Sequence, residues 1–149
     1  MQTAIRFDQK RLPSDTEALR EDVRAFLADE IARGTFTPGL GLQQDAFDRG
    51  FSKRVGEHGW TGMTWPKRYG GREMTHLDRY VVTEEMRAVT APAWCHFVAD
   101  RQSGPVILKY GTDALKEQIL PAITRGELCF AIGMSEPNSG SDLFAASVK

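Results

Sequence analysis

Apolar residues recur at intervals of three and four positions from Ser14 onward, and this periodicity ends abruptly at Gly126. Such spacing is the period of an amphipathic α-helix. Links that contain glycine and proline interrupt it, so the pattern predicts about five helices rather than one long helix. We therefore expect a chain that is mainly α in fold class.

The two ends of this helical region carry capping signals. Ser14 opens the pattern Ser-x-x-Glu of a capping box, which predicts that the first helix begins there and ends at Gly34. Thr112 is expected to cap the last helix. The predicted buried face of that last helix consists of Leu115, Ile119 and Leu120.

Between these ends we expect three further helices and one ordered loop. The loop is the stretch 59–71, which is not periodic and is rich in glycine, tryptophan and proline, so aromatic side chains should anchor it. The predicted helices are one that carries Phe47, Phe51 and Val55 and ends near Gly59, one from Leu77 to about Val89, and one from Pro92 to Tyr110 that Pro105 kinks or breaks.

The character of the sequence changes after Gly126. Residues 128–134 form a short apolar run followed by a turn-rich segment, and this length favours a buried β-strand. No partner strand follows before residue 149, so we expect a β region that this chain does not complete. The predicted division is a helical domain over 1–126 and the start of a β domain over 127–149.

Composition and charge exclude several classes of function. The 19 basic and 20 acidic residues are mixed along the chain, so no basic stripe supports nucleic-acid binding. No apolar stretch is long enough to span a membrane, and residues 1–15 are too polar for a secretory signal. Cys95 and Cys129 have no paired spacing, which predicts neither a disulfide nor a metal site. We expect a cytoplasmic protein.

The segment 135–142 is the richest in groups that can bind a ligand. It offers hydroxyls on Ser135, Ser139 and Ser141, carboxylates on Glu136 and Asp142, and a glycine that lets the backbone approach a ligand closely. Such a loop can present O–H and N–H donors to a planar heteroaromatic ring or to a phosphate. The same residue types also build ordinary polar turns, so composition alone leaves both interpretations open.

The same segment resembles the signature of the acyl-CoA dehydrogenase family, usually written Thr-Glu-Pro-x-Ala-Gly-Ser-Asp. Ser135 stands where the family has threonine and Ser139 where it has alanine, while the other defined positions match. Further blocks resemble the family in its order and approximate spacing. They are Gly59-Trp60, Pro66 with Tyr69-Gly70-Gly71, Glu84-Glu85, Tyr110-Gly111-Thr112, Lys116, Leu120-Pro121 and Gly126-Glu127.

This resemblance implies the N-terminal helical domain, and the first strand of the middle β domain, of a flavoenzyme that uses FAD. In that family the matching strand and loop line the flavin, which implies cofactor contacts from Ile132, Met134, Ser135, Gly140 and Ser141. Ser141 is also implied in binding the acyl-CoA substrate. The family's general base lies in a C-terminal domain, so we expect no catalytic residue in this chain, and no metal is implied.

The implied reaction introduces an α,β double bond into an acyl-CoA thioester. Hydride passes to the flavin, and an electron-transfer flavoprotein or a similar acceptor reoxidises it. The resemblance also implies a homo- or hetero-oligomer for the full-length protein. Two alternatives stay open, namely an acyl-CoA oxidase or flavin monooxygenase on the same scaffold, and a non-catalytic helical partner subunit.

Other conspicuous residues have structural interpretations. We expect the three tryptophans to anchor packing, and the three histidines, His96 among them, to lie at the surface or at helix ends. Glu84 and Glu85 are adjacent, and neighbouring positions on a helix point about 100° apart, so they are not expected to form a facing carboxylate pair. Cys129 is expected to be an inert packing residue.

Overall fold

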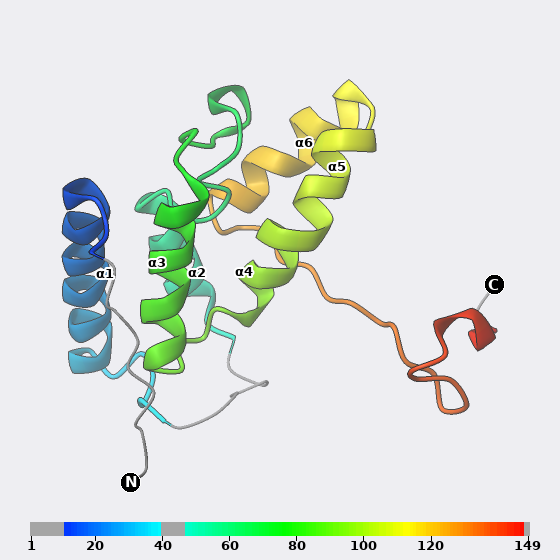
Figure 1. Cartoon of the computed structure of the whole chain (residues 1–149), viewed down its shortest axis with the longest axis horizontal. Helices are drawn as coiled ribbons and strands as arrows, with labels where there is room; N and C mark the ends of the chain where they lie inside the picture. The colour runs from blue at the N-terminus through cyan, green and yellow to red at the C-terminus, as the bar shows by residue number, and fades with distance from the viewer. Residues whose placement is uncertain (1–10, 40–46, 148–149) are drawn as a thin grey trace, which may run out of the picture.

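The computed structural model describes residues 11–39 and 47–147, and its helices follow the predicted order. Helix α1 (Ser14–Ala32) lies beside α3 (His76–Ala88), with α2 (Arg49–Glu57) behind them (Figure 1). A second group contains α4 (Trp94–Val98), α5 (Gly104–Tyr110) and α6 (Asp113–Thr124). The expectation of a mainly α chain is confirmed.

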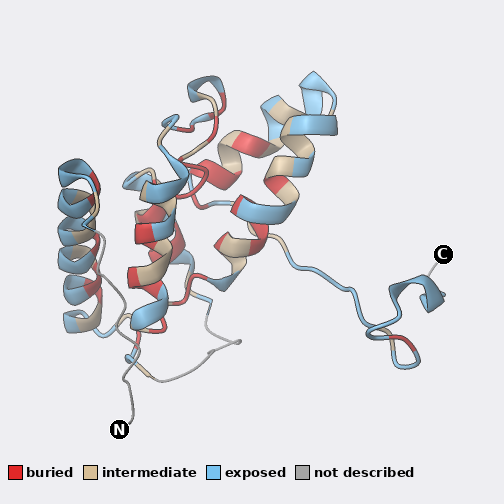
Figure 2. Ribbon diagram, in the orientation of Figure 1, coloured by how far each residue is buried: buried red, intermediate tan, exposed pale blue. Residues whose placement is uncertain are grey.

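A cluster of buried side chains joins the first three helices. Val23 of α1, Phe51 of α2 and Val82 of α3 meet there, as the helical spacing of their apolar positions requires. The rings of Phe26 and Phe36 pack around Phe51, with centroids 5.6 and 5.8 Å from it. Burying a side chain of this kind stabilises the fold by about 1.5–3 kcal/mol. Figure 2 shows these buried residues on the inward faces of the helices.

The second cluster lies between α6 and the loop over residues 59–71. Leu120 and Ile123 are fully buried against Trp65 and Tyr69, the second of which belongs to the 3₁₀ turn η1 (Lys67–Tyr69). The predicted anchoring of this loop by aromatic side chains is therefore confirmed. Of the three tryptophans, Trp94 differs from the expectation, because it is 42% exposed at the start of α4.

Side-chain caps start three of the described helices, and one of them is Asp48, whose carboxylate accepts from the N–H of Phe51 at the start of α2. The hydroxyl of Thr112 accepts from the N–H of Leu115 at 3.3 Å, as predicted, and Thr75 with Asp78 forms a full capping box at α3. The predicted cap at Ser14 is wrong. Pro13 occupies the capping position, and the Ser14 hydroxyl bonds to the carboxylate of the neighbouring Asp15 instead.

Gly126 ends the helical region because no other residue fits there. Its φ is +70°, and a Cβ at this position would lie 2.0 Å from the carbonyl oxygen of Ser52 on α2. Its N–H donates to the carbonyl of Ile123 at 2.9 Å and closes the last turn of α6. The end of α6 thus packs directly on the backbone of α2.

The predicted effect of Pro105 is also present. Between α4 and α5 the backbone widens into one π-helical turn, η2 (Ala99–Ser103). Proline has no N–H, so the bond that it would donate to the carbonyl of Arg101 is absent, and the regular α ladder is interrupted there.

The final described residues form an arm, residues 127–147, that leaves the helical body (residues 14–126) and runs away from it (Figure 1). Leu128 and Phe130 pack against the second cluster, but residues 131–135 are exposed. The predicted buried strand over 128–134 is wrong for this structure. The described residues offer the segment no β-ladder, and the arm's only helical element is the 3₁₀ turn η3 (Leu143–Ala145).

Two further side chains depart from the helical patterns. Phe47 precedes the residue that caps α2, Asp48, and is exposed rather than part of the helix's buried face. Leu115 is 40% exposed on α6, where Ile123 takes the buried position. One of the links that contain glycine and proline, residues 35–42, lies partly outside the described residues, and so do residues 1–10. Among the described helices, none is both long and apolar enough to cross a membrane.

Candidate functional site

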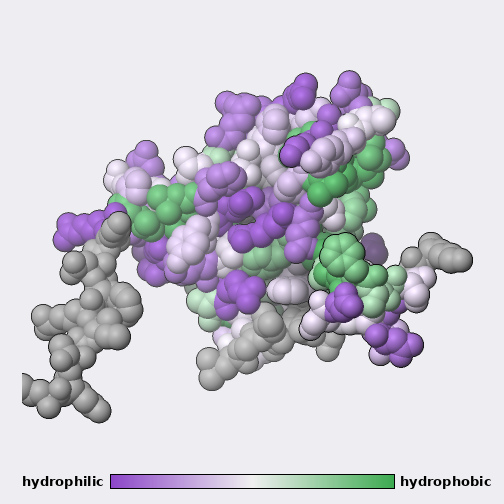
Figure 3. Space-filling view, turned by 45° about the vertical axis from the view of Figure 1, so that its right-hand side comes forward, coloured by the Kyte–Doolittle hydropathy of each residue, from purple (hydrophilic) through white to green (hydrophobic). Residues whose placement is uncertain are grey.

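The residues predicted to contact a cofactor all lie on the arm. Ile132 and Met134 precede the polar turn, and Ser135, Gly140 and Ser141 flank it. All five are exposed, with Met134 at 58% of its full surface. Large apolar side chains are also exposed on α5 and α6, and Figure 3 shows hydrophobic surface broken up by polar residues on this side of the molecule.

The polar turn of the arm is closed by its own hydrogen bonds. The N–H of Glu136 donates to the carbonyl of Ser139 at 2.7 Å, and the reverse bond measures 3.1 Å. The hydroxyl of Ser139 donates to the carbonyl of Asp142 at 2.5 Å, and this serine is the buried residue of the turn. Glu136 accepts from both the N–H and the hydroxyl of Ser147. Glu136 and Ser139 therefore shape the turn.

The predicted contact residues, in contrast, are left available. Within the described part of the chain, neither the Ser135 nor the Ser141 hydroxyl makes a hydrogen bond, and the backbone groups of residues 132–134 make none. No atom lies within 4 Å of where a Cβ on Gly140 would stand. Hydroxyl and N–H donors beside apolar Ile132 and Met134 fit the polar edge and the apolar face of a planar heteroaromatic ring. The donor set thus suits a flavin.

The described residues contain no group of three or more histidine, cysteine or acidic side chains placed to hold a metal ion. A metal centre therefore has no set of ligands within the ranges 11–39 and 47–147.

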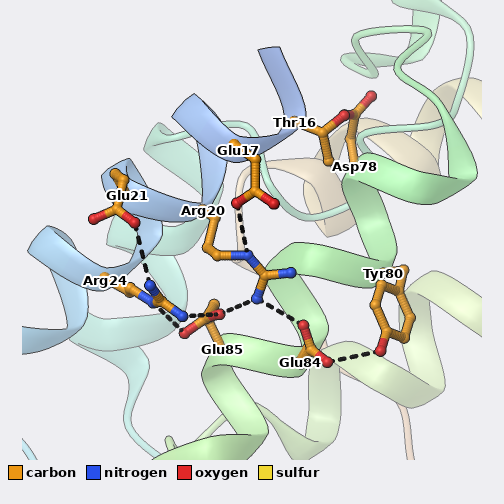
Figure 4. Close-up of polar contacts among 9 residues, drawn as sticks. All are labelled: Thr16, Glu17, Arg20, Glu21, Arg24, Asp78, Tyr80, Glu84 and Glu85. Atoms are coloured by element: carbon orange, nitrogen blue, oxygen red, sulfur yellow. Dashed lines mark hydrogen bonds and ion pairs between the residues drawn. The ribbon is translucent and has the colours of Figure 1, made fainter. Parts of the chain in front are cut away.

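The densest charged cluster joins α1 to α3 (Figure 4). The guanidinium of Arg20 bonds to Glu84 at 2.7 Å and also to Glu85, and Tyr80 donates to Glu84 at 2.7 Å. The hydrogen bond from Tyr80, followed by that from Arg20, lowers the pKa of Glu84. The structural interpretation of these glutamates is confirmed, although both carboxylates reach one arginine.

Two polar side chains, His96 of α4 and Asp100 of η2, are buried, and the sequence did not predict their burial. His96 lies in the last turn of α4, at a helix end as expected, but it is only 7% exposed and so not at the surface, and burial lowers its pKa to about 4. Its Nε2 lies 3.0 Å from the hydroxyl of Ser52. Asp100 is also buried and accepts from the N–H of Gly62 at 3.0 Å, and burial raises its pKa.

The cavity beside these groups is too small for a cofactor. His96 and Asp100 line a space of about 30 Å³, which has room for about one water molecule. The sequence did contain a signal for this burial, because the residues on both sides of His96, from Trp94 to Val98, are apolar. The cavity therefore belongs to the packing of the helical body, and the arm remains the candidate site.

Comparison with known proteins assigns most of the chain to one domain type. Residues 13–127 match the family model "Acyl-CoA dehydrogenase, N-terminal domain". The acyl-CoA dehydrogenase FadE26 of Mycobacterium tuberculosis is 40% identical over 90 residues, which cover 60% of this chain and 22% of that protein. The acyl-CoA dehydrogenase IpdE1 of the same organism is 32% identical over 136 residues, 87% of this chain and 35% of that protein.

A solved structure gives the same relationship in three dimensions. The ChsE4–ChsE5 complex of M. tuberculosis superposes with a TM-score of 0.75 at 29% identity, over 93% of this chain and 35% of that one. The present chain therefore covers between 22% and 35% of the length of each of these related proteins.

Proposed function

The chain belongs to the acyl-CoA dehydrogenase family, and from that premise we propose that it supplies the helical domain and one wall of the flavin site of an FAD-dependent dehydrogenase. The reaction proposed is the introduction of an α,β double bond into an acyl-CoA thioester. The match of residues 13–127 to the N-terminal domain supports a division near residue 126, with 127–149 as the start of the middle β domain.

The observation that carries the proposal is the set of free donors on the arm. The hydroxyls of Ser135 and Ser141 and the backbone beside Met134 have no partner within the described residues. We propose that these groups hold the flavin ring, that Gly140 lets the backbone approach it, and that Ser141 also contacts the acyl-CoA. When bound, FAD supplies the two-electron oxidation that this reaction requires.

The residues of this chain orient and bind; none of them is proposed as the general base. The carboxylate of Glu136 is engaged within the turn, because it accepts two hydrogen bonds from Ser147. Glu84 and Glu85 lie in the ion pairs between α1 and α3. The base is therefore proposed to lie in a further domain of the full-length enzyme.

The assembly and substrate class of the relatives suggest those of this protein. The ChsE4–ChsE5 structure is a complex of two named proteins, which supports a hetero-oligomer. The Tcur3481–Tcur3483 "steroid ACAD", 35% identical, supports a substrate whose acyl group is attached to a steroid. We further propose a cytoplasmic location and an electron-transfer flavoprotein or similar acceptor.

The test is the change Ser135→Ala in the full-length enzyme, with Ser135→Thr as the matched control that restores a hydroxyl. Losing one hydrogen bond should weaken flavin binding or slow its reduction by the equivalent of about 0.5–1.5 kcal/mol. Flavin content and stopped-flow reduction by acyl-CoA measure both effects. Unchanged flavin content and reduction kinetics in Ser135→Ala would contradict the assignment.

The same preparation separates the alternatives. Dye reduction without oxygen consumption supports a dehydrogenase, whereas rapid oxygen consumption identifies an oxidase or monooxygenase. A full-length protein that binds no flavin would identify a non-catalytic helical subunit.

A further inference from the structure

Two thiols meet at the point where the arm leaves the helical body. The Sγ atoms of Cys95 on α4 and Cys129 on the arm lie 3.0 Å apart, although 34 positions separate them in the sequence. Both side chains are half-buried and both are reduced. Their spacing predicted no pairing, and the contact arises because Leu128 and Phe130 seat the start of the arm on the second cluster.

We propose that Cys95 and Cys129 form a reversible dithiol–disulfide pair that small anionic disulfides, such as glutathione disulfide, oxidise. A disulfide bond places its sulfur atoms about 2.05 Å apart, so the two sulfurs need to approach by about 1 Å from their present contact. A change in the χ1 angles of the two cysteines can supply such a shift.

The surroundings of Cys129 suit it to react first. It lines a hollow of about 540 Å³ together with the exposed cations Arg49 and Lys53. The one acidic side chain of this hollow, Glu127, is held by Arg125 at 2.7 Å. These two cations attract an anionic disulfide to the Cys129 thiol. The hollow therefore combines an accessible thiol with a complementary charge.

Cys95 is suited to the second step. It lies on the protein side of the pair, where burial, and then the neighbouring Cys129, raise its pKa to about 12. Because its Sγ lies 3.0 Å from that of Cys129, it is placed to act as the resolving thiol once a mixed disulfide forms there.

The exchange balances in two steps. The Cys129 thiolate attacks one sulfur of the small disulfide, forms a mixed disulfide and releases one small thiolate. Cys95 then attacks the Cys129 sulfur, loses its proton and releases the second small thiol. Two protein thiols are oxidised to one disulfide while one small disulfide is reduced to two thiols. The product ties the start of the arm to α4.

The test treats the reduced 149-residue chain with glutathione disulfide, traps it in acid and maps its peptides by mass spectrometry. We expect a Cys95–Cys129 disulfide that a reductant reverses, in a chain whose circular dichroism shows intact helices. The folded chain should oxidise at a ratio of glutathione disulfide to glutathione at least about tenfold lower than the chain in guanidinium chloride. Equal ratios, unmodified thiols, or separate glutathione adducts on each cysteine would overturn the proposal.

Single variants check the order of the steps. Cys95→Ser should accumulate a mixed disulfide on Cys129, whereas Cys129→Ser should leave Cys95 unmodified. Removing both cations of the hollow, Arg49→Ala with Lys53→Ala, should slow oxidation by glutathione disulfide but not by the neutral hydroxyethyl disulfide. The measurement on the unchanged chain decides the proposal even where a variant does not fold. A mixed disulfide that forms first on Cys95 would overturn the proposed order.

Discussion

The helical body and the arm belong to one chain but differ in how many of their side chains have partners within that chain. In the body, Glu30 is 1% exposed and bonds to Arg54 at 2.6 Å, and Phe51 is buried among other rings. On the arm, Phe144 is fully exposed and the hydroxyls of Ser135 and Ser141 have no partner among the described residues. Groups without a partner in their own chain are suited to contact a ligand or another domain. This contrast supports the proposal that the body is a scaffold and the arm a contact surface.

The largest expected contrast is between two phenylalanines. Phe51→Ala removes a ring from the centre of the first cluster and should lower the free energy of unfolding by about 3–5 kcal/mol. Phe144→Ala removes an equal ring from the arm and should change it by less than about 0.5 kcal/mol. Urea titrations followed by circular dichroism measure both. Similar losses in the two variants would show that the arm is part of the folded core.

The next effect concerns the buried ion pair of the body. Glu30→Ala leaves the Arg54 guanidinium without its partner. Because the Arg54 side chain is 32% exposed, water compensates part of that charge, and we expect a loss of about 2–3 kcal/mol, below the range for fully buried pairs.

This loss should depend on pH with a defined sign. The hydrogen bond from Arg54 lowers the pKa of Glu30 below its ordinary value of 4.5. A carboxylate whose pKa is lower in the folded chain than in the unfolded chain stabilises the fold. This stabilisation is fully present at pH values above the unfolded-chain pKa and is lost as the pH falls through the folded-chain pKa. The unfolding free energies of the chain and of Glu30→Ala should therefore converge in acid. A difference that stays constant below pH 4.5 would contradict the ion pair.

A smaller effect is expected at the helix caps of the body. Thr75→Ala removes the capping box of α3 and should cost about 1 kcal/mol. Ser14→Ala is its matched control, because the Ser14 hydroxyl caps nothing, and it should change stability by less than about 0.5 kcal/mol. Thermal or urea unfolding measures both. Equal losses of stability in the two variants would indicate that Ser14 caps α1 after all, as the sequence predicted.

The sequence predicted local structure well wherever a local signal determines it. The buried position of Leu120 on the last helix, the cap at Thr112 and the stop at Gly126 all follow from neighbouring residues, and all are present. The prediction of a strand over 128–134 was wrong, because a strand depends on a hydrogen-bonded neighbouring strand, and the described residues provide none.

Contacts between distant residues could not be predicted in this way. Cys95 and Cys129 meet only after α4 and the arm pack on one cluster, and His96 becomes buried only when α2 brings Ser52 to it. The candidate site shows the same limit. Its residue types were visible in the sequence, but the use of Ser139 to close the turn, with Ser135 and Ser141 left free, is a property of the folded arm.

The smallest expected effect on stability comes from the apolar residues of the arm. Ile132→Ser with Met134→Ser should change the free energy of unfolding by less than about 0.5 kcal/mol, because both side chains are exposed. The double change should nevertheless reduce self-association of the chain, which exposed apolar groups promote. Sedimentation velocity at several concentrations measures it. A loss of stability, or unchanged association, would show that these side chains are not a contact surface.

The most direct test of the division into scaffold and contact surface is flavin retention by the purified 149-residue chain. The chain is mixed with FAD and desalted, and its visible absorbance and acyl-CoA-dependent dye reduction are recorded. Because the arm is proposed to supply only one wall of the flavin site and no general base, we expect a helical, colourless protein that reduces no dye. A yellow preparation that oxidises acyl-CoA would contradict the account, since it would place a complete active site within these residues.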